Sequence, residues 1–467
     1  MTQSRSTGVS GVRRVVTSLS FFMAFVGIGL VVSQARIASQ TFGGARDPGV
    51  RGGAAGAGGT VAGLSATQQE YFTAGQTDFA EAETVADGLG PRMNLDSCGG
   101  CHSQPALGGS SPAVNPQVAF AAAGADKVPS FILANGPVRE ARFVTNPDGT
   151  ADGGVHAIFT ITGRDGATGC SLAQPDFATQ LANHNVIFRI PTPTFGAGLM
   201  EQIPDAALIA NQASNASTKQ SLGIRGRPNF HVAGRTITGQ TNNNGNDGTI
   251  ARFGWKAQNK SMLLFSGEAY NVEMGITNEL FQTERDENRS CQFATTPNSV
   301  INPDAVDPVD SLNSIDKFAF FMRLLAAPTP STNSPGGSQS IGNGRGLFSS
   351  TGCALCHTPS FTTGPSAIAA LSQKPVNLFS DLLIHDMGTG LADGISQGEA
   401  GPREFRTAPL WGLGQRVFFL HDGRTSNLIT AIKAHQSTGS EANNVINRFL
   451  NLSESQKQDL LNFLRSL

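Results

Sequence analysis

Two five-residue motifs of the form Cys-x-x-Cys-His contain the residues best suited to chemistry. The first runs from Cys98 to His102 and the second from Cys353 to His357. In this pattern both thiols can bond covalently to a haem, and the adjacent histidine can ligate its iron. A thioredoxin-like dithiol would not need the histidine twice, and a zinc site would need a further ligand pair close by. The spacing therefore predicts two haem c groups, bound by Cys98, Cys101, His102, Cys353, Cys356 and His357.

Cys170 and Cys291 are the cysteines outside these motifs. Haem c is attached outside the cytoplasm, where the surroundings are oxidising, and the number of remaining thiols is even. We therefore predict a disulfide between these two residues. The alternative is a pair of buried thiols that do not react with each other.

The N-terminus has the features of an export signal. Arg13 and Arg14 precede an apolar stretch over residues 15–32, and small residues at 35–39 offer cleavage points. The apolar part is short for a membrane span, so residues 1–40 are interpreted as a signal peptide, with an uncleaved membrane anchor as the alternative. We expect the protein in the periplasm or otherwise outside the cytoplasm. Any contact with the inner membrane would pass through this segment alone.

The composition excludes several classes of protein. A net charge of −2 without a basic run gives no electrostatic basis for nucleic-acid binding. Only 15% of the residues are charged, whereas 55 are Gly and 24 are Pro, which favours loop-rich domains over a helical repeat or a coiled coil. The 467 residues allow two domains with cores of their own. Residues 41–64, mostly Gly, Ala and Val, predict a flexible tether.

Helical patterns flank both motifs and must position them. Residues 70–85 predict a helix ahead of Cys98, and residues 314–325 predict an amphipathic helix further along the chain. A short helix from Gly344 leads into the second motif. The capping-box pattern that begins at Ser453 opens a closing helix with an apolar face. A helix before the haem motif and an apolar helix after it are typical of cytochrome c.

Short strands are expected between the motifs, at residues 157–161 and 185–191. The stretch 328–343 is rich in Pro, Ser and Gly and is the best candidate for a linker between domains. The predicted fold class is therefore mainly α with extensive loops and a few short strands. It would comprise two cytochrome c-like haem domains, an elaborated one at 65–327 and a compact one at 344–467.

Several separated motifs resemble the bacterial di-haem oxidoreductase family, whose members are labelled thiol oxidoreductases or peroxidases. These motifs are Gly88-Leu89-Gly90-Pro91, Arg252-Phe253-Gly254-Trp255-Lys256, Glu273-Met274-Gly275, His385-Asp386-Met387-Gly388 and Leu420-His421-Asp422-Gly423-Arg424. The C-terminal half also resembles bacterial di-haem cytochrome c peroxidases at 405–410 and 418–423. Dithiol chemistry is not expected, because both Cys-x-x-Cys pairs would carry haem.

The resemblance implies an exported di-haem oxidoreductase that is peroxidase-like. Electrons would come from a small redox donor protein, such as a cytochrome c or a cupredoxin. They would pass through the His357 haem to the His102 haem, where a small oxidant such as hydrogen peroxide would be reduced. Other functions stay open at this point: an electron-transfer cytochrome without catalysis, a dioxygen-using enzyme resembling the rubber oxygenases, or a maturation enzyme that oxidises side chains of another protein.

The second ligand of the His357 haem follows from the same resemblance. In the peroxidases it lies fourteen residues after the histidine of the His-Asp-Gly motif, and His435 holds that position here. Met387 is the alternative ligand. Arg406 and Arg424 are candidate partners of the haem propionates, because a guanidinium binds a carboxylate through two hydrogen bonds.

The His102 haem has no obvious second ligand, since no histidine occurs between this motif and residue 154. We expect an open or water-bound distal side, with the distant His156 and Met274 as alternative ligands. The other distant histidines, His184 and His231, are expected in structural positions. Peroxide cleavage needs a group that moves a proton, and Glu273 is the candidate catalytic residue by its motif neighbourhood. A glutamate on a turn is the alternative reading of that residue.

The chain contains two tryptophans, Trp255 and Trp411. Either could lie between the haems and relay electrons. Core packing is the expected role of each taken alone.

Overall fold

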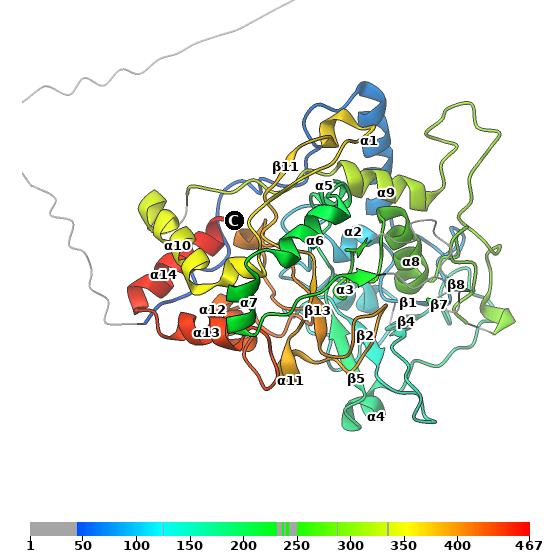
Figure 1. Ribbon diagram of the computed structural model, residues 1–467. Helices are drawn as coiled ribbons and strands as arrows, with labels where there is room; N and C mark the ends of the chain where they lie inside the picture. Colours follow the sequence, from blue (N-terminus) through cyan, green and yellow to red (C-terminus); the bar gives the residue numbers. More distant parts are fainter. Residues whose placement is uncertain are drawn as a thin grey trace, which may run out of the picture. The chain divides into compact units, whose positions relative to one another are not determined.

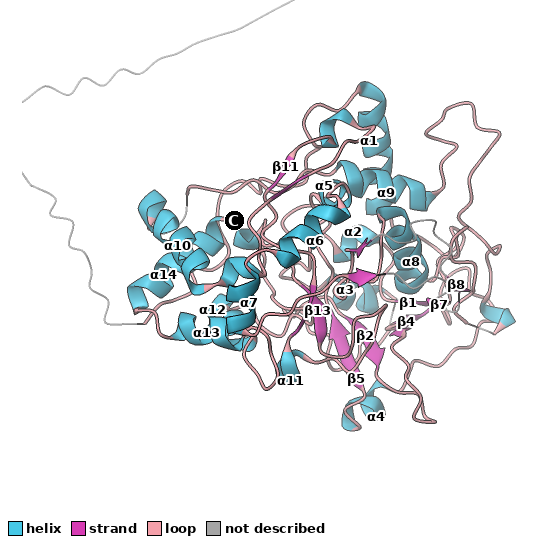
Figure 2. Cartoon of the chain, in the orientation of Figure 1, coloured by secondary structure: helices cyan, strands magenta, loops and turns pink. Residues whose placement is uncertain are grey.

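Helices and long loops build the described part of the chain, in agreement with the predicted fold class (Figures 1 and 2). The computed structural model describes residues 44–124, 126–230, 236–237, 240–241, 250–286, 288–333 and 336–467. The predicted signal peptide or anchor at 1–40 and His231 lie outside these residues. No helix within the described ranges is both long enough and apolar enough to span a membrane.

The chain forms α-helices of different lengths, with short 3-10 helices between some of them. The α-helices are α1 (Ala66–Ala80), α2 (Cys98–Cys101), α3 (Pro116–Ala123), α4 (Phe177–Ala182), α5 (Ala197–Glu201), α6 (Asp205–Ala213), α7 (Ala216–Leu222), α8 (Met262–Met274), α9 (Ser314–Leu324), α10 (Gly337–Thr351), α11 (Gly388–Leu391), α12 (Leu428–Ala434), α13 (Asn443–Leu450) and α14 (Glu454–Ser466).

The strands are short and pair antiparallel in small sheets (Figure 2). The two-stranded sheets are β1 (Arg92–Met93) with β4 (Phe159–Thr160), β6 (Asn229–Phe230) with β9 (Ile250–Ala251), β7 (Thr236–Ile237) with β8 (Gln240–Thr241), β10 (Phe361–Thr362) with β11 (Pro375–Val376), and β12 (Ile384–Asp386) with β13 (Glu404–Arg406). In a three-stranded sheet, β2 (Glu140–Phe143) lies between β3 (Val155–His156) and β5 (Val186–Arg189).

A helix before each motif packs against a later helix, and both pairs meet at a glycine. Helix α1 packs on α9, and α10 packs on α14 (Figure 1). A Cβ on Gly75 of α1 would lie 2.1 Å from the carbonyl oxygen of Lys317, and one on Gly344 of α10 would lie 2.1 Å from that of Asp459. Only a residue without a side chain lets the backbones approach this closely.

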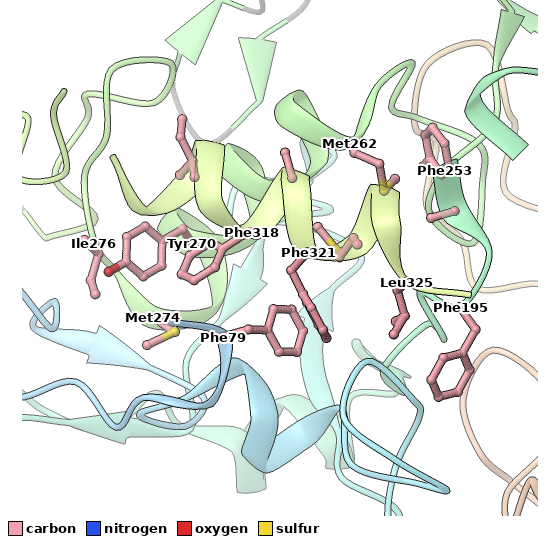
Figure 3. Packing of buried hydrophobic residues seen from close by; sticks show 14 of the residues in the cluster. Phe79, Phe195, Phe253, Met262, Tyr270, Met274, Ile276, Phe318, Phe321 and Leu325 are labelled. Carbon is pink, nitrogen blue, oxygen red and sulfur yellow. The ribbon is translucent and has the colours of Figure 1, made fainter. Parts of the chain in front are cut away.

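The aromatic packing next to these glycines is also repeated. Phe79 and Phe348 each follow the glycine by four residues, so each lies on the same helix face as the glycine. Their ring centroids lie 4.9 Å from Phe321 and 5.5 Å from Phe463 on the partner helices. Figure 3 shows Phe79 and Phe321 in this position in the first pair. The two motifs therefore sit beside helix pairs of one design, although the sequence has no obvious repeat.

The predicted helices are confirmed with shifted ends. Helix α9 matches its predicted range closely, and α14 begins with both hydrogen bonds of the predicted capping box at Ser453. Helix α1 ends at Ala80, not at residue 85, because acidic side chains follow and are unfavourable at the negative end of a helix dipole. Helix α10 begins at Gly337, inside the predicted linker, where Ser340 hydrogen-bonds to Asp459 of α14.

The hydrophobic cores do not follow the predicted domain boundary. One cluster of buried side chains surrounds α1, α8 and α9 (Figure 3), and another surrounds α10 and α14. The first cluster also includes residues of the predicted C-terminal domain, namely Ala370, Val376, Leu378 and Leu382. Residues Gly44–Leu467 form one compact unit.

Residues 44–64 differ from the predicted free tether, because they bind along the body of the protein. Asp47 forms an ion pair with Arg465 of α14 at 2.7 Å, and the backbone N–H of Leu428 donates to the same carboxylate at 2.7 Å. Further along, the N–H of Arg51 donates to the Gly414 carbonyl. Polar side chains within a Gly- and Ala-rich segment thus anchor it where composition alone predicts flexibility.

The Asp47→Asn variant is expected to lower the free energy of unfolding by about 3–5 kcal/mol, the usual cost of breaking a buried ion pair. Only 5% of the Asp47 side chain and 2% of the Arg465 side chain are exposed, so the arginine charge would be left buried. Burial raises the pKa of Asp47, but the bonds from Arg465 and from backbone N–H groups outweigh it and lower that pKa. The stabilisation is therefore present near neutral pH and lost as the pH falls through the lowered pKa.

Denaturant unfolding of both proteins at neutral and acidic pH measures this effect. The difference between wild type and variant should shrink in acid. Equal stability at neutral pH would contradict an anchored segment.

The predicted disulfide between Cys170 and Cys291 is confirmed. It joins the loop after β4 to the loop after α8. The cysteines of the two Cys-x-x-Cys-His motifs are not bonded to each other, so all four thiols are available for other bonds.

Candidate active site and haem pockets

Each motif lines a large cavity. The first cavity is bounded by Cys98, Cys101 and His102, and the second by Cys353, Cys356 and His357. About 1130 and 1380 Å³ of space free of protein atoms lies in and around the two cavities, and both figures include space open to solvent. Each motif therefore faces a space in which a cofactor could bind.

The first motif presents its histidine as a neutral ligand. The Nδ1 of His102 lies 2.9 Å from the carbonyl oxygen of Gly109, so Nδ1–H donates and Nε2 keeps its lone pair. Burial lowers the pKa of His102 to about 4. The edge of the Phe79 ring faces the imidazole with centroids 5.9 Å apart, which holds the ring plane in place.

The second motif repeats this arrangement. The Nδ1 of His357 lies 3.0 Å from the carbonyl oxygen of Phe379, and the Phe348 ring lies 6.3 Å from the imidazole. Burial, followed by the charge of His435, lowers the pKa of His357 to about 4. A neutral imidazole with a free Nε2 is the form that binds iron.

The structure brings His435 to the second cavity, where it lines the same space as His357 although the two residues are far apart in the sequence. It follows α12, and its Nδ1 lies 2.8 Å from the carbonyl oxygen of Ala431. Its Nε2 is therefore also left as an acceptor, and burial lowers its pKa. Met387 lines this cavity as well. Two histidines with the same tautomer suit bis-histidine ligation, which stays a prediction.

Two arginines of the second cavity, the buried Arg406 and the half-buried Arg416, fit the carboxylates of a haem. Arg406 and Arg416 both line it, and burial lowers the pKa of each to about 10. Neither forms an ion pair with a carboxylate among the described residues; Arg406 donates to the Gly254 carbonyl at 2.9 Å. Two unneutralised guanidinium groups in one pocket call for an anionic ligand. Arg416 was not predicted, because it belongs to none of the recognised motifs.

Arg424, the other predicted propionate partner, does not line either cavity. Its Nε pairs with Asp422 at 2.7 Å and its Nη1 donates to the Gly390 carbonyl at 2.7 Å, with 38% of the side chain exposed. Gly423, in the left-handed region at φ +66°, turns the chain so that the guanidinium folds back on its own loop. The motif predicted the turn but not the direction of this side chain.

An arginine in the first cavity is similarly suited to an acidic group. Arg189 of β5 lines this cavity, and its buried Nε has no hydrogen-bond partner among the described groups. Its Nη2 pairs with the buried Asp393. The cysteine pair, the neutral histidine and the unpartnered donor together fit a haem in the first cavity too.

Glu273 lines the first cavity together with the first motif, as its predicted role requires. It stands in the last turn of α8, and its Oε2 accepts a hydrogen bond of 3.0 Å from Asn94. Glu140 and Arg142 of β2 line the same cavity. Burial and the neighbouring charge of Glu140 raise the pKa of Glu273 well above its usual range. Glu140 was not a sequence candidate, because a Glu-x-Arg pattern on a strand is common.

The strand register explains why His156 does not reach this cavity. His156 pairs with Ala141 of β2 and lies on the same face of the sheet. Glu140 and Arg142 flank Ala141 on β2, so their side chains point to the other face. His156 stacks on Phe143 at 3.8 Å and pairs with Asp152 at 2.9 Å. The expectation that it could ligate the first haem is therefore wrong.

The other distant candidates are also accounted for. Met274 lines the first cavity, with its sulfur 3.9 Å from the sulfur of Cys98, beside the thiol that would carry the haem. His184 has a positive φ of 55° in a turn and lines neither cavity. Among the described residues that line the first cavity, His102 is the one histidine.

Trp255 lines both cavities, and no other described residue is shared by them. Its indole N–H donates to the carbonyl of Ile190 at 2.9 Å. The second tryptophan, Trp411, lines neither cavity and packs in the first hydrophobic core. The structure thus separates the two tryptophans, which the sequence could not.

A family model described as "Di-haem oxidoreductase, putative peroxidase" matches residues 138–467, which is more than half of the chain. The chain belongs to the di-haem oxidoreductase family. The matched range includes the second motif, Trp255 and all three carboxylates of the first cavity, whereas the first motif precedes it. A comparison of this chain with curated protein sequences found no match.

Solved structures of other proteins are distantly similar to this di-haem oxidoreductase. A MauG-like protein associated with microbial copper homeostasis is 18% identical, with a TM-score of 0.27 over 59% of this chain and 90% of its own. The diheme peroxidase BthA from Burkholderia thailandensis is 13% identical, with a TM-score of 0.27 over 59% and 86%. Hydrazine synthase of Kuenenia stuttgartiensis is 16% identical, with a TM-score of 0.22 over 34% of this chain and little more than half, 56%, of its own.

Proposed function

We propose that this protein is an exported di-haem c-type cytochrome that reduces a peroxide, with haem bound covalently by the two Cys-x-x-Cys-His motifs. One observation carries the proposal. Four histidines line the second cavity, and two of them, His357 and His435, donate Nδ1–H to a backbone carbonyl and keep Nε2 as an acceptor. His102, with the same arrangement, is the one histidine among the described residues that line the first cavity. A site with one protein ligand leaves a position for a small oxidant.

The first cavity is the proposed site of chemistry. A haem bound there would supply the iron that delivers electrons to the peroxide. His102 would hold that group from one side, and Arg189 offers a donor for one of its carboxylates. Glu273 can exchange a proton with a ligand in the cavity, and Asn94 fixes the carboxyl group in one orientation. The residues of this chain thus provide binding, orientation and proton transfer.

The second cavity is the proposed entry point for electrons from a small cytochrome c or cupredoxin. His357 and His435 would both hold a haem bound there, which suits electron transfer and disfavours direct reaction with the oxidant. Trp255 is the proposed relay, since its side chain borders both cavities.

The Trp255→Phe variant is expected to slow electron transfer between the two haems and to leave the spectrum of each haem unchanged. Phenylalanine keeps an apolar ring at this position but lacks the indole and the N–H. Stability should fall by about 1 kcal/mol, because the Ile190 carbonyl loses its donor. Stopped-flow spectroscopy after one-electron reduction measures the rate, with Trp411→Phe as the matched control. Equal rates in the two variants would contradict a relay role.

Electron paramagnetic resonance of the ferric protein tests the proposed function directly. We expect one low-spin and one high-spin signal, and a change of the high-spin signal on addition of peroxide. Two low-spin signals with no response to peroxide or cyanide would contradict it and would favour an electron-transfer cytochrome. Haem that dissociates in acidic organic solvent would contradict covalent attachment.

A further inference from the structure

A pair of acidic side chains faces the first cavity from two different elements. Glu140 extends from β2, and Glu273 extends from the end of α8. Their carboxyl groups are close enough for each to shift the pKa of the other. A carboxylate only accepts hydrogen bonds, so two neighbouring carboxyl groups can share one only if one of them carries a proton. We call Glu140 and Glu273 the carboxyl pair.

The hydrogen bonds around Glu273 fix its orientation. Its Oε2 accepts from the Nδ2 of Asn94 at 3.0 Å, while the Oδ1 of Asn94 accepts from the N–H of Ile158 at 3.2 Å. The amide of Asn94 is thus set by the backbone and cannot turn over without losing a bond. This leaves the other carboxyl oxygen of Glu273 for Glu140.

Two arginines, Arg142 and Arg189, lie on the Glu140 side of the carboxyl pair. The Nε of Arg142 pairs with Glu140 at 2.6 Å, and both residues lie on the same face of β2. Arg189 stands directly opposite Glu140 in the strand register. Arg285 approaches from the loop after α8, but its guanidinium donates to the backbone carbonyls of Val272 and Val155.

Glu268 is the further acidic group that lines this cavity, five residues before Glu273 on α8. Its carboxylate accepts a hydrogen bond from Asn259.

We propose that Glu140 is a positioning residue that keeps the shared proton on Glu273, and that Arg142 holds the negative charge on Glu140. The inference rests on the proposed function, in which Glu273 exchanges a proton with a ligand in the cavity. The pKa directions agree with it. At Glu140 burial is outweighed by Arg142 and the pKa falls to about 2, whereas burial and the charge of Glu140 raise that of Glu273 well above its usual range.

Infrared spectroscopy of the haem-loaded protein tests the position of the proton, through the carbonyl band of a protonated carboxyl group. The spectrum is recorded at mildly alkaline pH, where Glu83 and Glu284 are ionised, because burial raises their pKa values only to about 7. We expect one such band in the wild type and its loss in Glu273→Gln. The matched control Glu284→Gln should retain it.

The Glu140→Gln variant tests the positioning role. Without the negative neighbour, Arg142 would stabilise an ionised Glu273, so the band should disappear at the same pH. Arg142→Lys keeps a positive charge beside Glu140 and should retain the band, which provides a conservative variant if Glu140→Gln does not fold. A wild type without the band, or a band unchanged in Glu140→Gln, would overturn the inference.

These outcomes are distinguishable from failure of the proposed function. The infrared band reports the proton and does not require peroxide turnover. A protein that reduces peroxide but lacks the band retains the proposed function and loses the carboxyl-pair inference. A protein with the band and no reaction with peroxide shows the reverse.

Discussion

The Glu273→Gln variant is expected to lose about 10²–10⁴-fold in peroxide-dependent turnover, the range over which a positioned acid–base group contributes. Glutamine preserves the size of the side chain and its hydrogen bond from Asn94, but it has no acidic proton. Haem content and the ferric spectrum should match those of the wild type, so the loss would belong to proton transfer. Steady-state oxidation of a reduced donor protein by hydrogen peroxide measures it.

Glu268→Gln is the matched control for this experiment, because Glu268 lines the same cavity from the same helix. Its activity should stay near that of the wild type. If Glu268→Gln lost activity and Glu273→Gln did not, the acid–base role would belong to Glu268.

The same carboxyl group predicts the pH dependence of the wild type. Since the pKa of Glu273 is raised well above its usual range, its neutral form persists to a higher pH than that of an ordinary glutamate. Turnover that uses this acid should be constant below the raised pKa and fall as the pH rises through it. Activity that instead increases with pH through the usual range of a glutamate would show that the ionised form does the work.

The His435→Met variant should raise the reduction potential of one haem on the order of 0.1 V, within the roughly 0.8 V range that axial ligands span. Imidazole is the stronger donor and favours ferric iron, whereas a thioether favours the reduced form. Methionine also removes the bond from Nδ1–H to the Ala431 carbonyl, which costs about 1 kcal/mol. A spectroelectrochemical titration that resolves the two haems measures the shift.

Met387→Leu is the control for this ligand, since Met387 lines the same cavity. The potential and spectrum of that haem should stay unchanged in Met387→Leu. A shift there, combined with none in His435→Met, would assign the ligand to Met387 instead.

Features that depend on a few neighbouring residues were predictable from the sequence. The capping box at Ser453 forms because its partners are three residues apart, and α9 follows its apolar periodicity. His435 was placed by its distance from a recognised motif, and it lines the cavity that this distance implies. In each case the spacing along the chain determines the contact.

Features that depend on strand register or on distant partners were not predictable. A single residue of register separates Glu140, which faces the first cavity, from His156, which pairs with the adjacent Ala141 and faces away. Arg416 lines the second cavity although it belongs to none of the recognised motifs. Trp255 and Trp411 have similar burial, and only the position of the cavities distinguishes them.

The ion pair between Asp47 and Arg465 has a consequence for the modularity of this molecule. Residues 344–467 resemble a separate cytochrome domain in sequence. Arg465 in their last helix, however, pairs with Asp47, which lies 418 residues earlier in the chain. A cassette excised at Gly344 would carry a buried arginine with no counter-ion. The transferable unit for a chimaera or a minimal electron-transfer protein is therefore discontinuous: it must include the segment around Asp47, rejoined to the C-terminal residues.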